Sequence, residues 1–323
     1  MASRQEADIE HTFASHPSVY SYNIDTDSSV AKQDILQFLR HRLAEIRSVN
    51  KYLPFDSDWP SDGKVRALGE CADGLFVWAS TACLYIDSHD PRLRLDELTT
   101  QTSVYTSSAP FTNLDRLYHT GLLSAGTWAD PAFCSDCCDI FGAILCARIP
   151  LRCTAIDSLL ALPRPCLQSI SRLRCVLRGG ETDAIRVLHP SFHDYLSSRC
   201  RGEAWFIDLE QHNENLAICC IKLLDKSLRE NILELTLPHL VQKETLPESM
   251  SYACRFWIEH VCKISRIADN IGVQILDFLT VHLLHWIEAM AIIKSHGNTI
   301  QLLEDLLNWL RVSHPIQFLG WLG

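Results

Sequence analysis

The stretch Val187-Leu188-His189-Pro190-Ser191-Phe192-His193-Asp194-Tyr195-Leu196 decides the expected fold. Its apolar start predicts a short strand. Pro190 is typical of the first position of a helix, because its fixed φ fits there and its missing N–H needs no partner. A helix N-terminus exposes N–H groups and a partial positive charge, and so can hold an anion. Because His189 stands at this junction, it could add a hydrogen bond to a phosphate.

The elements around this stretch predict a winged-helix domain over residues 111–211. We expect helices over 114–123, 133–148, 150–160 and 165–177, a turn at Gly179-Gly180, and a strand over 184–188 that ends at His189. A helix, a helix pair and then a strand beside a glycine turn follow the order of a winged helix.

A helical domain is expected upstream, over residues 26–110. Apolar residues at helical spacing predict its first helix, namely Ile35, Phe38, Leu39, Leu43 and Ile46. The long apolar run 65–86 follows, with Gly74 expected inside a helix, where it would allow close packing. Pro91 is expected to end this region, and the Ser- and Thr-rich segment 99–110 to form a linker.

Residues 212–323 are almost entirely helical by pattern, so the whole chain is expected to be mainly α. Breaks are predicted at Pro238, Pro247, Gly272 and Gly297. The most apolar window, 275–293, contains four polar or charged residues that a bilayer-spanning helix would not readily accept: Asp277, His282, His285 and Glu288. We therefore expect an amphipathic core helix and no membrane association.

Net charge and cysteine content argue against some classes of function. The 323 residues carry a formal net charge of −10, which argues against nonspecific binding to nucleic acid or anionic membranes. The fourteen cysteines are scattered through apolar segments. Because the N-terminus is polar and carries no secretory signal, we expect a cytoplasmic protein whose thiols are reduced and mostly act as small core residues.

No catalytic or metal-binding constellation is evident. Cys134, Cys137 and Cys138 form a C-x-x-C-C motif, but a zinc site usually needs a second ligand pair at fixed spacing, and none follows. Ser191, His193 and Asp194 would point in different directions on one helix, so they cannot form a nucleophile–base relay. We therefore predict neither an enzyme nor a metal site.

A winged helix can also bind DNA through its recognition helix, for which residues 165–178 are the candidate. This segment carries Arg172, Arg174 and Arg178. Three arginines on an acidic chain are a weak signal, because phosphate neutralisation should dominate affinity. A DNA-binding regulator is therefore a minor alternative, and no nucleic-acid partner is expected.

Further segments lie in a fixed order on both sides of the first stretch. They are Ala2-Ser3-Arg4-Gln5-Glu6-Ala7-Asp8-Ile9, Asp34-Ile35-Leu36-Gln37-Phe38-Leu39, Trp59-Pro60-Ser61, Gly74-Leu75-Phe76-Val77-Trp78-Ala79, Tyr252-Ala253-Cys254-Arg255-Phe256-Trp257 and His282-Leu283-Leu284-His285-Trp286-Ile287-Glu288. Together they resemble the fungal NACHT-domain signalling ATPases of the STAND class, which are large multidomain proteins related to animal NOD-like receptors.

The resemblance implies four regions. Residues 1–25 would be a remnant of the NTPase core, 26–110 the helical lid, 111–211 the winged-helix domain and 212–323 a helical spacer. Arg4 matches the family's nucleotide-sensing arginine, although Gln5 replaces the proline that follows it there. His189 matches the histidine that can contact the phosphates of bound ADP and hold the off state.

The chain departs from the family at the ATP site. The family's Walker A loop, G-x-x-x-x-G-K followed by Ser or Thr, cradles phosphate with backbone N–H groups. The Gly63-Lys64 pair is followed by Val65 and lacks the upstream glycine, so it is not such a loop. No acidic pair follows an apolar strand as in Walker B.

We therefore predict a non-catalytic regulatory fragment that acts through protein partners, which could include an intact NACHT relative. His189 and Arg4 would be vestigial nucleotide-binding residues. No cofactor is expected, and ATP or ADP would bind only if the missing P-loop region were supplied. The main alternative is a nucleotide-dependent switch whose P-loop lies in upstream sequence absent from this chain.

Overall fold

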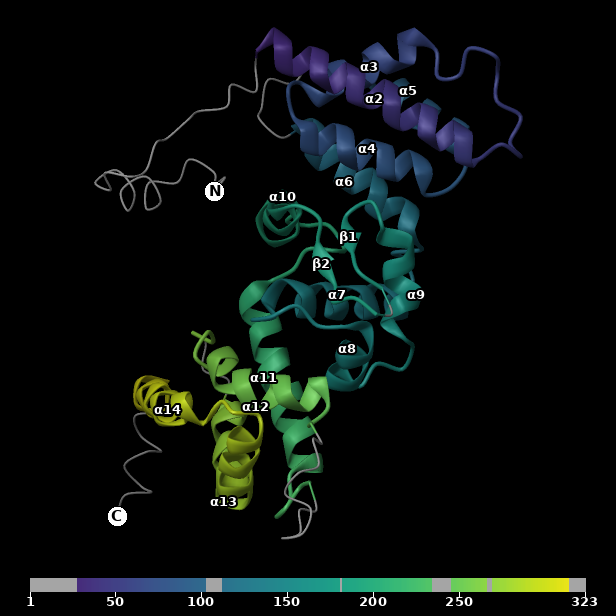
Figure 1. Cartoon of the computed structure of the whole chain (residues 1–323). Coiled ribbons are helices and arrows are strands. Elements are labelled where there is room, and N and C mark those ends of the chain that lie inside the picture. The colour runs from purple at the N-terminus through teal and green to yellow at the C-terminus, as the bar shows by residue number, and fades with distance from the viewer. Residues whose placement is uncertain (1–27, 103–111, 181, 234–244, 266–268, 314–323) are drawn as a thin grey trace, which may run out of the picture.

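The computed structural model describes residues 28–102, 112–180, 182–233, 245–265 and 269–313. The fold is mainly α, as the sequence predicts (Figure 1). Within the described residues, the sheet consists of β1 (Leu177–Arg178) and β2 (Arg186–Val187), an antiparallel pair with Leu177 opposite Val187. Arg4 and the predicted remnant over residues 1–25 lie outside the described part of the chain.

The first helices pack together at one end of the molecule (Figure 1). They are α2 (Ser29–Val49), α3 (Asp62–Ala72), α4 (Phe76–Asp87), α5 (Pro91–Thr102) and α6 (Thr112–Ala125). Helix α2 begins where the Ser28 hydroxyl accepts a hydrogen bond from the Ala31 amide at 3.1 Å. Its apolar stripe faces the core, with Ile35, Leu39, Leu43 and Ile46 buried.

Two predictions for this region are wrong. The run 65–86 is not continuous, because Asp73 and Gly74 adopt left-handed backbone with φ of 41° and 79° and separate α3 from α4. Gly74 therefore makes a turn, which glycine permits at little cost. Pro91 ends no helix but starts α5, which continues to Thr102 and so takes in the beginning of the expected linker.

The middle helices follow. They are α7 (Pro131–Cys146), α8 (Cys153–Leu160), α9 (Cys166–Ile170) and α10 (Pro190–Asp194), with the 3₁₀ turn η1 (Ser171–Leu173) and the π-helical turn η2 (Tyr195–Arg199). Helix α7 begins at a proline, and the Asp130 carboxylate caps it by accepting from the Ala132 amide at 3.0 Å.

The single helix expected over 165–178 is also wrong. The segment buries Cys166, Ile170 and Leu173, but it changes from helix α9 through η1 into strand β1. The Val176 carbonyl accepts a hydrogen bond from the Leu188 amide at 2.9 Å, so the β pairing with the stretch before His189 replaces the helical hydrogen bonds. Arg172, Arg174 and Arg178 lie in η1, in the turn after it and in β1, so they do not share one helical face.

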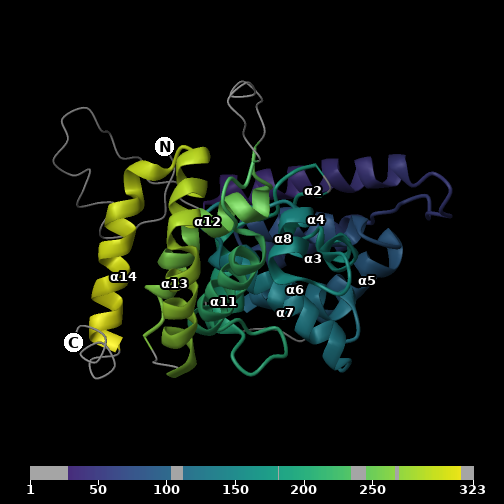
Figure 2. The same cartoon turned by 90° about the horizontal axis from the view of Figure 1, so that it is seen from below.

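The C-terminal helices are α11 (Leu209–Ser227), α12 (Glu248–Val261), α13 (Asp269–Ile292) and α14 (Thr299–Ser313), with the 3₁₀ turn η4 (His296–Asn298) before α14. Figure 2 shows them side by side at one end of the molecule. Helix α11 starts at the middle helices, where the Asp208 carboxylate caps it, and α12 and α13 pack along it.

Glycine 272 does not break the chain as predicted, because it lies in the first turn of α13. There the neighbouring Ile271 and Ile275 are buried, and this burial offsets the low helix propensity of glycine. The predicted breaks at Pro247 and Gly297 do lie at the start of α12 and in η4. Pro238 lies outside the described residues.

Within the described residues, the segment Ile271–Ile292 of α13 is long and apolar enough to span a bilayer. One side of this helix packs on its neighbours. Trp286 is buried, donates from Nε1 to the Cys254 carbonyl at 2.9 Å, and meets Trp257 edge-on at 6.0 Å between ring centroids. The other side carries exposed apolar residues, of which Leu284 is 77% exposed.

Candidate functional site

His189 caps helix α10. Its backbone is extended, with φ of −145°, and Pro190 occupies the first helical position as the sequence predicts. The His189 Nδ1 accepts a hydrogen bond from the Ser191 amide at 3.2 Å and lies 2.7 Å from the Ser191 hydroxyl. Because Nδ1 accepts from an amide, the proton of the neutral ring belongs on Nε2. The histidine thus satisfies one of the amides that a helix start leaves unpaired.

The residues that follow His189 pack helix α10 against α6. The buried Ser191 hydroxyl lies 2.8 Å from the hydroxyl of Tyr118 on α6. Phe192 and Tyr195 pack on the Tyr118 ring, with ring centroids 5.0 Å and 5.5 Å away. Arg199 donates to the Ser191 carbonyl at 2.9 Å and pairs with the Asp115 carboxylate of α6 at 2.9 Å. His189 is therefore linked through Ser191 to the contacts that hold α10 on α6.

The other predicted candidates are placed apart. Ser191 faces Tyr118, whereas His193 lies 3.8 Å from the Asp194 carboxylate, so the three residues form no relay. Cys134 and Cys138 both donate to the Ala204 carbonyl, at 3.4 Å and 3.3 Å. All fourteen cysteines are free thiols, and most are buried in the core as predicted. Within the described ranges, no cluster of three or more His, Cys, Asp or Glu residues is placed to hold a metal ion.

A second polar centre, which the sequence reasoning missed, lies where α7 meets α11 and α12. His260 of α12 is fully buried. Its Nδ1 lies 2.9 Å from the amide oxygen of Asn213 on α11, and its Nε2 lies 2.8 Å from the Tyr252 hydroxyl. The Tyr252 hydroxyl also accepts the backbone N–H of Arg148, just beyond α7, at 3.3 Å.

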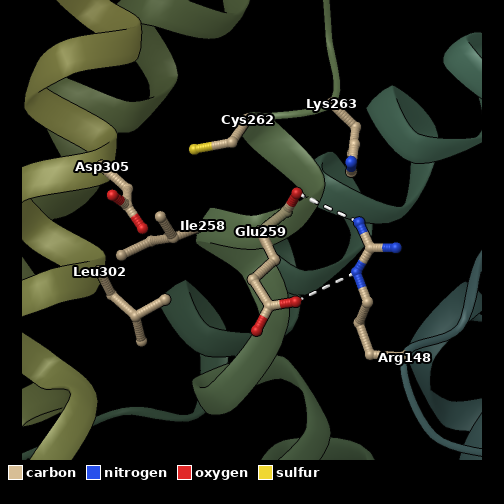
Figure 3. A pocket seen from close by; sticks show the side chains of 7 residues that line it. All are labelled: Arg148, Ile258, Glu259, Cys262, Lys263, Leu302 and Asp305. Carbon is tan, nitrogen blue, oxygen red and sulfur yellow. Dashed lines mark hydrogen bonds and ion pairs between the residues drawn. The ribbon is translucent and has the colours of Figure 1, made fainter. Parts of the chain in front are cut away.

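The Arg148 side chain clamps α12 from the same side (Figure 3). Its guanidinium donates to the Glu259 carbonyl at 3.3 Å, forms an ion pair with the Glu259 carboxylate at 3.2 Å, and reaches the Asn213 amide oxygen at 3.5 Å. Burial, together with the Arg148 charge, lowers the pKa of His260 to about 3. The imidazole is thus neutral at physiological pH.

A cavity of about 280 Å³ opens beside this clamp, between α12 and α14 (Figure 3). It is lined by Arg148, Ile258, Glu259, Cys262, Lys263, Leu302 and Asp305. Burial raises the pKa of the Cys262 thiol to about 11, so this thiol is protonated at neutral pH and is a poor nucleophile.

One sequence signal could have located this centre. Tyr252, Phe256 and His260 follow one another at intervals of four, so a helix presents all three on one face. A histidine that continues an aromatic face predicts a buried imidazole, but its partners Arg148 and Asn213 lie 112 and 47 residues away. No local pattern identifies partners at such separations.

Comparison with known proteins gives one similarity along nearly the whole chain. The chain is 22% identical, over 342 aligned positions, to the vegetative incompatibility protein HET-E-1 of Podospora anserina, and the match covers 95% of the chain. The chain spans about a quarter of the length of that relative (24%). No family model and no solved structure matches. The similarity supports a NACHT-like family for the chain.

Proposed function

We propose that this chain is a non-catalytic regulatory module of a NACHT-type STAND signalling protein and acts through contacts with other proteins. The main support for this proposal is the similarity to HET-E-1 over 95% of the chain. The sequence of the chain also contains no Walker A loop. In this proposal residues 26–110 correspond to the lid, 111–211 to the winged helix and 212–323 to the helical spacer, all in the cytoplasm.

His189 then has a structural role in this chain. Its Nδ1 is used in capping α10, and the hydroxyl next to it is bonded onward to Tyr118. In the family that the sequence resembles, the histidine at this position can contact the phosphates of bound ADP. Without a P-loop to hold the nucleotide, we propose that His189 retains the cap and is only a vestige of the nucleotide site.

Exposed apolar side chains support a function through protein contacts. Val49 and Tyr52, at the end of α2 and just after it, are mostly exposed, as are Val281 and Leu284 on α13. Apolar side chains exposed at both ends of the molecule favour association with other polypeptides. In HET-E-1 the matched segment is part of a protein about four times as long. Apolar surfaces of that segment could therefore be covered by other parts of the same protein.

Sedimentation velocity tests the proposed association. The purified chain is mixed with intact HET-E-1 in Mg·ADP and, separately, in Mg·ATP, and each protein is also run alone. We expect the chain to sediment with HET-E-1 at micromolar concentrations in at least one nucleotide state. A double variant, Val281→Asp with Leu284→Asp, changes only exposed positions and tests whether α13 takes part.

Two outcomes would contradict this function. Separate sedimentation of the two proteins in both nucleotide states would remove the support for action on an intact relative. Hydrolysis of ATP by the purified chain alone would contradict the non-catalytic assignment. It would favour the alternative of a nucleotide-dependent switch, which an upstream reading frame encoding a Walker A loop would establish.

A further inference from the structure

The joint between the middle helices and the C-terminal helices depends on one buried imidazole. Helix α11 leaves the middle helices and packs against both α7 and α12 (Figure 1). His260 lies where these three elements meet, fully buried, with a partner on each ring nitrogen. A change in its protonation state therefore affects all three elements at once.

The hydrogen bonds around His260 have a fixed direction. The Asn213 amide nitrogen donates to the Leu209 carbonyl at 2.7 Å, and a carbonyl can only accept, so the amide oxygen faces His260. The His260 Nδ1 must then carry the proton and donate. In the neutral ring Nε2 then has no proton and can only accept, so the Tyr252 hydroxyl, which itself accepts the Arg148 N–H, donates its own proton to Nε2. This arrangement requires a neutral ring with Nε2 unprotonated.

Burial and the Arg148 charge oppose a second proton on His260, and the other groups around it supply no free negative charge. The α7 side contributes the Arg148 guanidinium and the Cys146 thiol, and α11 contributes Asn213 and the Cys220 thiol. Helix α12 contributes Tyr252 and Glu259, whose carboxylate is paired with Arg148. Burial raises the pKa of both thiols and of the Tyr252 phenol, so these three groups are neutral near pH 7.

Other titratable groups lie close to this centre. Lys263 and the Asp305 carboxylate of α14 line the cavity beside Arg148 and Glu259 (Figure 3). His212 of α11 lies over Gly142 of α7, beside Asp139, and burial lowers its pKa as well. His212 is thus a second acid-sensitive group at the same helix pair, and the test must separate it from His260.

We propose that protonation of His260 loosens the packing of α7 against the α11–α12 pair, so that this joint acts as a pH-sensitive conformational switch. A proton on Nε2 would place N–H against the Tyr252 hydroxyl, which would then accept two N–H groups and leave its own proton without an acceptor in the buried site. It would also bury a second positive charge close to Arg148. The switch needs neither nucleotide nor partner, so it goes beyond the proposed function.

The buried Cys146 thiol reports on this joint, because it accepts from the Asn213 amide at 3.5 Å. Cys83, buried in α4, provides the reference in the distant N-terminal helices. The full chain is treated with 4,4′-dithiodipyridine at pH values from 7.5 to 5.0, and labelling of each cysteine is read by peptide mass spectrometry. Each rate is divided by that of the urea-unfolded chain at the same pH, which removes the intrinsic chemistry of the thiol.

We expect the corrected Cys146 rate to rise roughly 30-fold relative to Cys83 between pH 7.5 and 5.0. This factor follows from a ring pKa of about 3 in the closed joint and of about 6.5 in the open one. The His260→Gln variant, which cannot be protonated, should lose most of this rise. The matched His212→Gln variant keeps His260 and should retain it.

A wild-type chain in which Cys146 and Cys83 respond equally to acid would overturn the proposal, and this result does not depend on any variant folding. A rise that persists in His260→Gln but disappears in His212→Gln would also overturn it, because it would assign the acid response to the other histidine.

Discussion

The two ends of the middle helices each hold a histidine, and the two surroundings give the same side chain different tasks. His189 lies at the α6 end, partly exposed, and its Nδ1 accepts from the Ser191 amide two residues farther along the chain. His260 lies at the α11–α12 end, fully buried, and its partners come from two helices. One ring caps a short helix, and the other holds helices together.

The difference shows where each part of the fold obtains its stability. A cap replaces a hydrogen bond that water could also supply, so its net contribution is small. A buried network with no access to water must satisfy every member, so the loss of one member leaves the others unpaired. We therefore expect the α11–α12 end to be more sensitive to substitution and to pH than the α6 end.

The largest expected effect comes from His260→Ala. This change removes a buried ring and leaves the Tyr252 hydroxyl and the Asn213 amide oxygen without their partner, so we expect a loss of about 3 kcal/mol or more in the free energy of unfolding. Urea denaturation measures it. His193→Ala, a change at a partly exposed ring, is the control and should cost less than about 0.5 kcal/mol. Equal losses for the two variants would break the comparison.

The next effect is on stability against pH. The pKa of His260 is lower in the folded chain than in the unfolded chain. Below pH 6.5 the unfolded chain therefore binds a proton that the folded chain does not bind. As the pH decreases from 6.5 to about 3, the free energy of unfolding decreases with it. Between pH 7.5 and 5.0 this group should cost roughly 2 kcal/mol. Urea denaturation at both pH values measures the decrease in the free energy of unfolding. This decrease should be about 2 kcal/mol smaller in His260→Gln than in the wild-type chain. Identical losses would contradict the assignment.

A smaller difference in the free energy of unfolding is expected between variants of two tyrosines. Tyr252→Phe leaves the Arg148 N–H and the His260 Nε2 without a partner, whereas Tyr118→Phe removes one bond to the Ser191 hydroxyl. We expect the first variant to lose about 1 kcal/mol more than the second. Thermal unfolding of both variants at one pH would sharpen the comparison, and a greater loss for Tyr118→Phe would reverse it.

The smallest effect concerns the cap itself. His189→Ala should cost about 1 kcal/mol, because the Ser191 amide loses its acceptor, whereas His189→Asn should cost only a few tenths because asparagine also caps well. Chemical denaturation of both variants against the wild-type chain distinguishes them. If the asparagine variant were as unstable as the alanine variant, capping would not explain this position.

Local chemistry explains which parts of the structure were predictable. The periodic apolar residues of α2, the proline that starts α10 and the place of His189 just before that helix all follow from neighbouring residues. The errors came where tertiary packing decided between local options. Gly74 could have continued a helix but makes a turn, and Gly272 could have broken a helix but lies inside one.

The candidate sites divide in the same way. His189 was found because a strand, a proline and a helix stand next to it in the sequence. The segment 165–178 was misjudged because pairing of β1 with β2 is a contact between separate segments. The His260 centre was missed because Arg148, Asn213 and Tyr252 come together only when α7, α11 and α12 pack.

Calorimetric titration with Mg·ADP and Mg·ATP, performed on the purified chain and on His189→Ala, tests most directly whether His189 is a cap and no longer a nucleotide ligand. We predict no binding heat for either nucleotide with either protein. Micromolar binding by the wild-type chain that is lost in His189→Ala would contradict this. It would mean that a nucleotide pocket survives at the start of α10 without a Walker A loop.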